Sequence, residues 1–345
     1  MDTLLFDLDE FNSLYSCTNF TSEEWGAHSN PNRLVSELYV GSGAIYLTVY
    51  LPVLLVMAQP RLIGKSVYKI MFFLGALDIM SLIPNSIIAG VLQWKGYIFC
   101  MAPVFNYQLG SIVTGLWTAS CVACLVLLLN RLFETGKNTT VFGGINIYFW
   151  LLLPLIAFLS FFWLSKPLLF SSHFYAFSTD PHLGIPGMES KGQYEDVLYN
   201  LNNIVYSALV IILVPIVAGL AFCQKNTERT EKANAITRQA IFLCLLKLIP
   251  ALAFSWIHLL PYDPILLTFG QIFQQMSHGL PAFVYLAMNE TIRSTVFHIF
   301  GLESTTMKKG TSSSDLNEND LEFPPEIRVW RNPSNASTSN TSVQK

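Results

Sequence analysis

The run IMFFLGALDIMSLIPNSIIAGVL, residues 70–92, contains a single charged side chain, that of Asp78. A helix needs about 20 predominantly apolar residues to cross the hydrocarbon core of a bilayer, with a range of about 17–25. The run has that length, and it lacks the short alternating pattern that is typical of the strands of a membrane barrel. It therefore predicts a membrane-spanning helix with one carboxylate inside the membrane.

Six further apolar segments of similar length lie on either side of this run. Only one of them, residues 240–260, carries a formal charge, that of Lys247. Lipid cannot satisfy open backbone groups, so each segment is expected to be a helix. The predicted fold class is an all-α membrane protein, a seven-transmembrane helix bundle. The other five segments are residues 38–58, 101–130, 145–164, 203–223 and 264–288.

The composition of the whole chain excludes other classes of protein. Of 345 residues, 52% are hydrophobic and 12% are charged, whereas about a quarter of the residues of a soluble domain are charged. A soluble enzyme is therefore excluded, and a net charge of −3 gives no reason to expect nucleic acid as a partner. The sequence contains no HExxH, GxSxG, P-loop or GxGxxG motif, and its histidines have no metal-ligand spacing. We expect no catalytic residues, no metal and no cofactor.

The distribution of Lys and Arg predicts the orientation of the bundle, because basic residues concentrate in inner loops. With the N-terminus outside and the C-terminus inside, the inner side holds more basic residues than the outer side. The inner residues are Arg61, Lys65, Lys69, Arg131, Lys137, Lys225, Arg229, Lys232, Arg238 and Arg293, and the outer ones are Arg33, Lys95, Lys166 and Lys191.

This orientation divides the chain into three parts. Residues 1–37 are expected to form an extracellular segment, and residues 38–300 the transmembrane domain, which ends in a short cytoplasmic helix 8. Residues 301–345 are rich in Ser, Thr and Asn, which predicts a disordered cytoplasmic tail. The tail is either a phosphorylated regulatory segment or a plain solvated one.

Two cysteines fall on the outer side, Cys17 and Cys100. That side faces an oxidising compartment, so a bridge between them is the natural hypothesis, with two free thiols as the alternative. Asn19-Phe20-Thr21 is a glycosylation sequon on the same side. Together these features favour a multi-pass protein of the plasma membrane.

The two charges within the apolar segments are candidates for a function inside the membrane. A charge near the bilayer centre costs about 2.5–3.5 kcal/mol, so Asp78 is expected to face the interior of the bundle. It is either a switch whose contacts differ between two states or a static buried polar contact. Lys247 either pairs with Asp78 or extends to the inner headgroups, because it lies only about eight residues into its segment.

Several aromatic and polar side chains in the outer and middle thirds of the segments are candidates for a ligand pocket. Such pockets are mostly apolar with a few polar groups. Aromatic belts at the membrane interface and core packing are the alternative for each residue. The candidates are Tyr107, Trp117, Tyr206, Trp256, His258 and Gln271.

Five stretches resemble, in their order and spacing, the nematode chemoreceptor family called serpentine receptor class T. The resemblance implies a seven-transmembrane receptor of the G-protein-coupled superfamily that binds a small, odorant-like molecule. It also implies a heterotrimeric G protein as the inner partner and the cilia of sensory neurons as the location. The stretches are YKIMFFLGALD (68–78), GYIFC (96–100), GLW (115–117), NR (130–131) and GLPA (279–282).

Rhodopsin-like receptors at large imply roles for some of these residues. Residues 74–78 resemble the sodium-site motif of the second helix, with Asp78 as the ion-binding carboxylate. Asn130-Arg131 resembles the acidic-arginine motif of the third helix, which implies that Arg131 contacts the G protein, although Asn130 replaces the acidic residue. Pro281 and Tyr285 lie in the switch region of the seventh helix, but they are four residues apart rather than three.

The predicted function is therefore a chemosensory receptor that binds a small molecule outside and activates a heterotrimeric G protein inside. One alternative is a ligand-gated cation channel of the insect odorant-receptor kind, whose N-terminus lies inside, opposite to the distribution of basic residues here. Another is a small-solute transporter, which should show repeat symmetry and more polar groups at the midplane. Membrane lipid surrounds the protein in each case.

Overall fold

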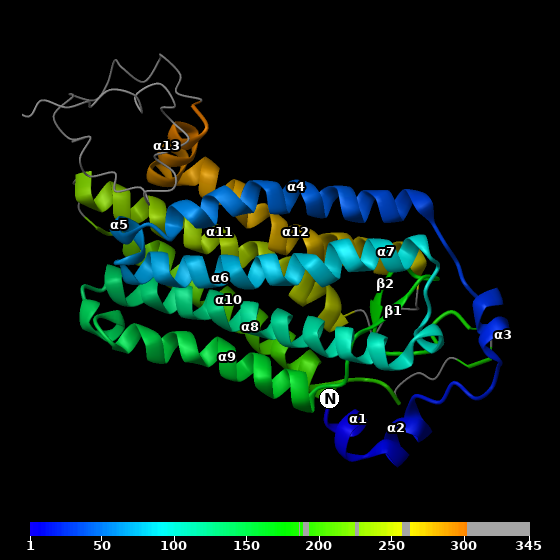
Figure 1. Ribbon diagram of the computed structural model, residues 1–345. Helices are drawn as coiled ribbons and strands as arrows, with labels where there is room; N and C mark the ends of the chain where they lie inside the picture. The colour runs from blue at the N-terminus through cyan, green and yellow to red at the C-terminus, as the bar shows by residue number, and fades with distance from the viewer. Residues whose placement is uncertain (186, 189–192, 225–227, 257–262, 302–345) are drawn as a thin grey trace, which may run out of the picture. The chain divides into compact units, whose positions relative to one another are not determined.

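The structure is a computed structural model that describes residues 1–185, 187–188, 193–224, 228–256 and 263–301. Met1–Phe300 form one compact unit, and Gly301–Lys345 form a second. Only Gly301 of the second unit is described, so the predicted disordered tail lies outside the described residues. The first unit is mostly helical (Figure 1).

Seven long helical segments within the described residues follow the seven predicted segments in order. They are α4 (Arg33–Met57), α6 (Ser66–Leu82) with its continuation α7 (Ala89–Trp94), α8 (Pro103–Thr135), α9 (Asn146–Leu164), α10 (Val197–Phe222), α11 (Glu228–Trp256) and α12 (Pro264–Met288). By length and composition, six of these are apolar enough to cross a membrane. The seventh, α12, has a comparable length but a run of buried polar residues, among them Gln274, Gln275, Ser277 and His278.

Several helices extend beyond the apolar segments that predicted them. The helix α8 runs to Thr135, and α10 begins at Val197 where the Asp196 side chain accepts a hydrogen bond from the backbone N–H of Leu198. A capping side chain, not the first apolar residue, thus sets that end. The predicted boundary is correct where the capping residue directly precedes the apolar run. The helix α12 begins at the predicted Pro264, after the capping Asp263, and proline is favoured at the first position of a helix.

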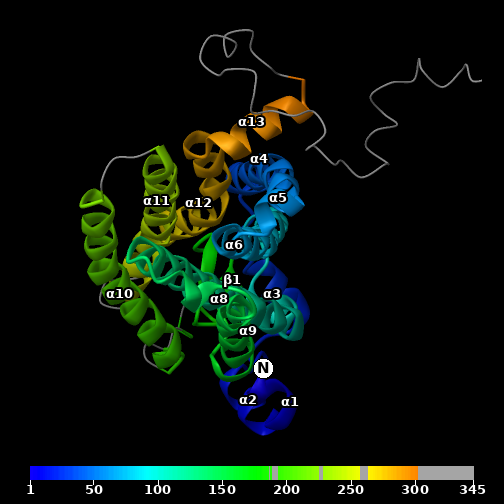
Figure 2. The ribbon, with the colours of Figure 1, turned by 90° about the vertical axis from the view of Figure 1, so that its left-hand side faces the viewer.

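The long helix α8 lies in the middle of the bundle. It packs against α6, α9, α10 and α11, while α4 packs against α6, α7 and α12 (Figure 2). A π-helical turn, Ile83–Ile88, joins α6 to α7 and contains Pro84, which has no backbone N–H to donate. The backbone carbonyl of Asn85 in this turn accepts hydrogen bonds from the side chains of Gln271 and Gln275 at 2.8 and 3.0 Å. The irregular turn is therefore tied to α12.

The connection between α9 and α10 contains two short strands, which the all-α prediction omitted. The strands β1 (Leu169–Ser171) and β2 (Ala176–Ser178) pair antiparallel, with Phe170 opposite Phe177. Strands of three residues carry too little periodicity to be recognised from sequence. The side-chain oxygen of Asn106 on α8 and that of Gln271 on α12 accept hydrogen bonds from the backbones of Phe170 and Phe177.

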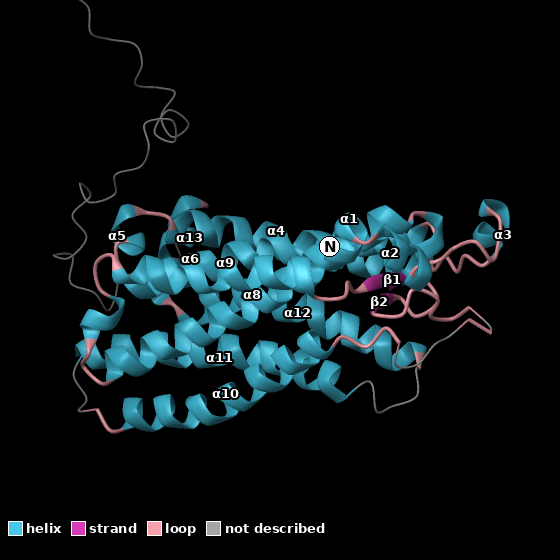
Figure 3. Cartoon of the chain, turned by 90° about the horizontal axis from the view of Figure 1, so that it is seen from below, coloured by secondary structure: helices cyan, strands magenta, loops and turns pink. Residues whose placement is uncertain are grey.

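We call the end of the bundle that carries this hairpin the hairpin end, and the opposite end the α13 end (Figure 3). Three short helices precede the bundle and lie at the hairpin end: α1 (Asp2–Phe6), α2 (Leu8–Leu14) and α3 (Ser22–Ala27). A helix in the place predicted for helix 8, α13 (Glu290–Ile299), follows α12. The remaining short helices are α5 (Pro60–Ile63) and the 3-10 turns Phe99–Met101 and Thr139–Phe142.

Candidate functional site

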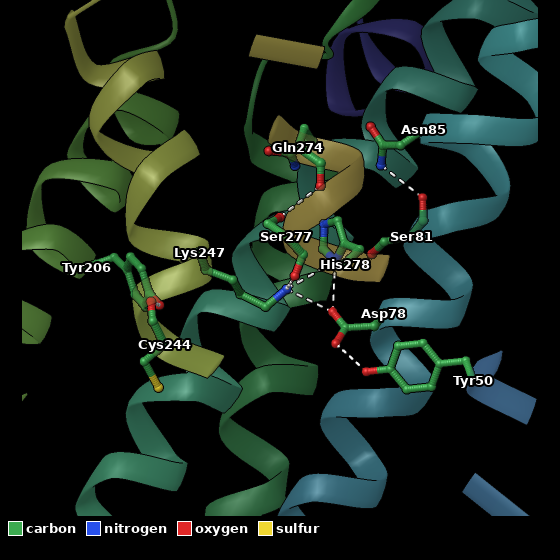
Figure 4. Close-up of polar contacts among 10 residues, drawn as sticks. All are labelled: Tyr50, Asp78, Ser81, Asn85, Tyr206, Cys244, Lys247, Gln274, Ser277 and His278. Carbon is green, nitrogen blue, oxygen red and sulfur yellow. Dashed lines mark hydrogen bonds and ion pairs between the residues drawn. The ribbon is translucent and has the colours of Figure 1, made fainter. Parts of the chain in front are cut away.

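Four side chains from four helices meet in the middle of the bundle, and we call them the core cluster: Tyr50, Asp78, Lys247 and His278 (Figure 4). The Lys247 ammonium lies 2.8 Å from one carboxylate oxygen of Asp78, and the Tyr50 hydroxyl donates to the other oxygen at 2.7 Å. Nδ1 of His278 lies 2.8 Å from the first oxygen. All four side chains are fully buried. Of the two alternatives for Lys247, the structure contains the pair with Asp78.

The Lys247 ammonium has three polar neighbours. Besides Asp78 it lies 3.3 Å from the backbone carbonyl of Ser277 and 3.1 Å from Nδ1 of His278. An ammonium group has three donors, and the Asp78 carboxylate and the Ser277 carbonyl accept from two of them. The carboxylate that resembles a sodium ligand thus holds a cation that belongs to the chain itself.

The charge balance of the core cluster indicates the protonation of His278. One carboxylate and one ammonium already cancel, and a second positive charge in the membrane interior would be costly. A neutral ring with its proton on Nδ1 donates to Asp78, which leaves Nε2 as an acceptor. Nε2 has no partner among the described residues, and the ring of Trp117 packs edge-on against His278 with centroids 5.9 Å apart.

A glycine allows α4 to approach the cluster. A Cβ at Gly75 would lie 3.0 Å from the ring of Tyr50 and 2.6 Å from a methyl group of Leu54. Any larger residue would push α4 away from α6, and the Tyr50 hydroxyl would then lose its reach to Asp78. The sequence of α6 therefore positions both the carboxylate and the phenol that binds it.

A second polar group lies at the α13 end, and we call it the Arg131 cluster: Ser66, Asn130, Arg131 and Glu134. The Arg131 guanidinium pairs with Glu134 at 2.7 Å and donates to the side-chain oxygen of Asn130. Ser66 on α6 donates to Glu134 at 2.9 Å. The Arg131 side chain is 3% exposed and that of Glu134 is 31% exposed. An acidic partner for Arg131 therefore exists, three residues after it.

At the hairpin end the structure contains the disulfide between Cys17 and Cys100. The N-terminal segment that it fixes packs into the mouth of the bundle, where the rings of Phe11 and Tyr15 lie 5.2 and 5.1 Å from that of Tyr107. The sequon residue Asn19 is exposed. Tyr107 thus contacts the chain's own N-terminal segment.

His182, in the loop after the hairpin, lies against this N-terminal segment. We call the N-terminal segment and this loop together the cap. Nε2 of His182 lies 3.1 Å from the backbone carbonyl of Ser16, and the His182 ring stacks on Trp25 with centroids 6.2 Å apart. Burial lowers the pKa of His182 below its usual 6.5, and the Ser16 carbonyl and Asp180 offset this only in part.

The remaining predicted residues lie at different depths. Trp117 donates to the side chain of Asn203 at 2.7 Å, and Tyr206 donates to the backbone carbonyl of Cys244 at 2.8 Å. Pro281 and Tyr285 are buried in α12, and the Tyr285 ring packs against Tyr50. His258 lies outside the described residues, as does the side chain of Trp256 at the end of α11.

Sequence reasoning missed four members of these clusters: Tyr50, Ser66, Glu134 and His278. Glu134 follows Arg131 at a spacing of three, which on a helix predicts a contact. His278 belongs to a polar run, Gln274 to His278, in an otherwise apolar segment, and that run was a usable signal. Tyr50 gave no signal, because buried tyrosines are common in such helices.

These features define a helical membrane protein whose bundle core contains a buried ion pair within a cluster of side chains from four helices, with a disulfide-bonded cap at one end. The sequence model of the family described as serpentine type 7TM GPCR chemoreceptor Srt matches residues 4–309. The chain belongs to this family. It is 24% identical over 295 residues to serpentine receptor class T-55 of Caenorhabditis elegans, which covers 83% of this chain and 80% of that protein. The family resemblance seen in the sequence is confirmed.

Proposed function

We propose that the protein is a chemosensory receptor that binds a small molecule at the hairpin end and activates a heterotrimeric G protein at the α13 end. In this proposal the hairpin end faces outside, as the distribution of basic residues indicates. Family membership supports the class of function, and the core cluster supports the mechanism.

The observation that carries the proposal is the buried ion pair between Asp78 and Lys247, with His278 against both. Buried pairs are weak contributors to stability, because desolvation offsets most of their attraction. With His278, the pair joins α6, α11 and α12, which suits a switch, because a relative movement of these helices changes its contacts. Pro281 and Tyr285 lie on the same helix as His278 and take part in that movement.

Polar atoms beside the core cluster give a route from the ligand to the switch. The buried side-chain oxygens of Ser81 and Gln274 and the Nε2 atom of His278 have no hydrogen-bond partner in the described part of the chain. Ser81 and Gln274 lie one helical turn from Asp78 and His278, on the side of Asn85 (Figure 4). A polar group of a ligand that reaches this level would contact the switch directly. Trp117, Tyr206 and Gln271 are candidates for the apolar and polar walls around this level.

Coupling to the G protein is assigned to Arg131 and Asn130. In the structure Arg131 is engaged by Glu134 and Asn130, and Asn130 in turn donates to Ser66 on α6. We infer that this is the uncoupled arrangement. Activation would release the guanidinium from Glu134 and present it to the G protein.

The orientation is tested first, with two exposed sequons. Asn19 lies at the hairpin end, and Asn138 lies in the loop between α8 and α9 at the α13 end. A glycosidase should shift the electrophoretic mobility of the wild type and of Asn138→Gln, but not that of Asn19→Gln. Glycan on Asn138 alone would invert the bundle and refute the receptor proposal.

Coupling is then tested in cells that express the receptor with a G protein dissociation sensor, screened with volatile odorants. Arg131→Ala should abolish the response of the wild type and leave surface expression intact. Normal signalling by this variant would contradict the assignment of Arg131.

A further inference from the structure

A groove lies between α10 and α11 towards the α13 end, with a volume of about 660 Å³. Ligand sites in proteins commonly have volumes of about 300–1,000 Å³. Ala218 and Phe222 of α10 form one wall, and Asn234, Arg238 and Ile241 of α11 form the other. Gln224 closes the groove where α10 ends.

The outer edge of the groove opens away from the interior of the bundle. The buried face of α11 contains Ala240, Cys244 and Lys247. At about 100° per residue, Arg238 lies about 160° around the helix from Ala240, on the opposite face. On the other wall, Phe222 is 90% exposed. In a membrane the outer edge of this groove, with Arg238 and Phe222, therefore faces the surrounding lipid, while its inner edge reaches the buried residues Ala221 and Thr237.

The groove combines apolar walls with one uncompensated positive charge. Arg238 is exposed, and within the described ranges of the chain no acidic side chain pairs with it. The neighbouring amides are held in place, since Gln224 donates to the backbone of Thr135 and Asn234 donates to that of Ala221. The site thus presents a guanidinium and two oriented amide groups above an apolar slot.

Charge at this end of the bundle favours an anion. The described basic residues there outnumber the described acidic ones, and one of the acids, Glu134, is already paired with Arg131. The basic residues are Arg61, Lys65, Lys69, Arg131, Lys137, Lys232, Arg238 and Arg293, and the acidic ones are Glu134, Glu231 and Glu290.

We propose that this groove is a binding site for one acidic phospholipid, with its phosphate on Arg238 and an acyl chain along Ala218, Phe222 and Ile241. A guanidinium binds phosphate through two parallel hydrogen bonds, which a lysine cannot reproduce. The acyl chain explains why a charged site lies beside an apolar slot on the lipid-facing side. This assignment goes beyond the proposed function and does not depend on G protein coupling or on the orientation of the bundle.

The test uses the full chain purified in detergent micelles that contain equal amounts of phosphatidylcholine and phosphatidylserine. Native mass spectrometry counts the lipids that remain bound. The wild type should retain one phosphatidylserine in preference to phosphatidylcholine. Arg238→Gln should weaken that binding about fivefold, which corresponds to one basic contact at a membrane surface. Arg238→Lys should recover part of it.

Two further variants separate the site from general charge attraction. Ala218→Trp should fill the slot and reduce retention although Arg238 remains. The matched control Arg61→Gln removes an exposed basic residue of α5 at the same end and should leave retention unchanged. Equal loss in Arg61→Gln and Arg238→Gln, or no loss in Arg238→Gln, would overturn the proposal. Displacement of the lipid by inositol trisphosphate at the same concentration would reassign the site to a soluble phosphate.

Discussion

The core cluster and the Arg131 cluster both bury a cation beside a carboxylate, but they are built in different ways. Lys247 is 169 residues from Asp78 in sequence, and His278 is 200 residues from it, so the core cluster exists only when α6, α11 and α12 are in register. Arg131 and Glu134 are three residues apart on one helix, and Ser66 links Glu134 to α6. The core cluster therefore depends on the tertiary structure of the whole bundle, whereas the Arg131 cluster depends mainly on a single helix.

This difference predicts that the two clusters fail differently when broken. Removal of either charged member of the core cluster leaves the other charge buried and uncompensated, so folding should suffer first. Removal of a member of the Arg131 cluster leaves a residue that can still reach water through the partly exposed Glu134 position, so coupling should change first.

The largest effect is expected for Lys247→Ala. The Asp78 carboxylate would remain buried with no cation, which costs about 3–5 kcal/mol of unfolding free energy. Thermal unfolding of the purified receptor and surface expression should both show this loss. The double variant Asp78→Asn with Lys247→Met removes both charges and should recover most of the stability. If the double variant is as unstable as the single one, the pair acts through its shape and not its charge.

The disulfide at the hairpin end should rank next. Cys17→Ser removes the link to Cys100, and loss of a bridge typically costs about 2–4 kcal/mol. Because α1 and α2 also pack on Tyr107, the cap should loosen while the core cluster stays intact. Faster proteolysis before residue 33, with an unchanged bundle core, is the expected result. Cys223→Ser, at an exposed free cysteine, is the control. Unfolding of the whole bundle in Cys17→Ser would show that cap and core fold as one.

The two clusters also differ in how far the sequence predicts them. Charges inside apolar segments stand out, so Asp78 and Lys247 were both recognised, and the cysteines followed from the topology. That the Lys247 side chain turns inward to Asp78, and not towards the headgroups, depends on the rotation of α11 against α6. Hydrophobicity does not encode this rotation in a helix that is apolar on nearly every side. His278 was not recognised as a site residue, because a neutral imidazole carries no formal charge.

The Arg131 cluster could have been predicted more completely from the sequence. Glu134 could have been assigned to Arg131 from helix spacing alone, without any tertiary information. It was overlooked because the comparison with rhodopsin-like receptors directs attention to the preceding residue, Asn130. The hairpin was not predictable from its own three-residue strands, since it is held by side chains of α8 and α12.

A smaller effect on stability, but a clear one on signalling, is expected for Glu134→Gln. The pair is partly exposed and Arg131 keeps Asn130, so the loss of stability should be about 1 kcal/mol or less. Basal G protein activation should rise, because Arg131 loses its ion pair with Glu134. The exposed pair Arg33–Glu37 gives the matched control, and Glu37→Gln should change neither quantity. Unchanged basal activity in Glu134→Gln would mean that the pair does not restrain Arg131.

The smallest effect concerns pH and compares the core cluster with the cap, which contains a titrating group outside the bundle core. His182 in the cap has a pKa below 6.5 because it is buried. Below about pH 6.5 the unfolded chain therefore binds a proton that the folded chain resists, so His182 lowers stability as the pH falls and has no such effect above that value.

His182→Gln keeps a donor for the Ser16 carbonyl and removes the titration. The difference in unfolding temperature between the wild type and this variant should change below about pH 6.5 and stay constant above it. A pH-independent difference for His182→Gln would mean that the protonated ring finds a new acceptor in the cap, and that the cap, unlike the core cluster, can rearrange around a charge.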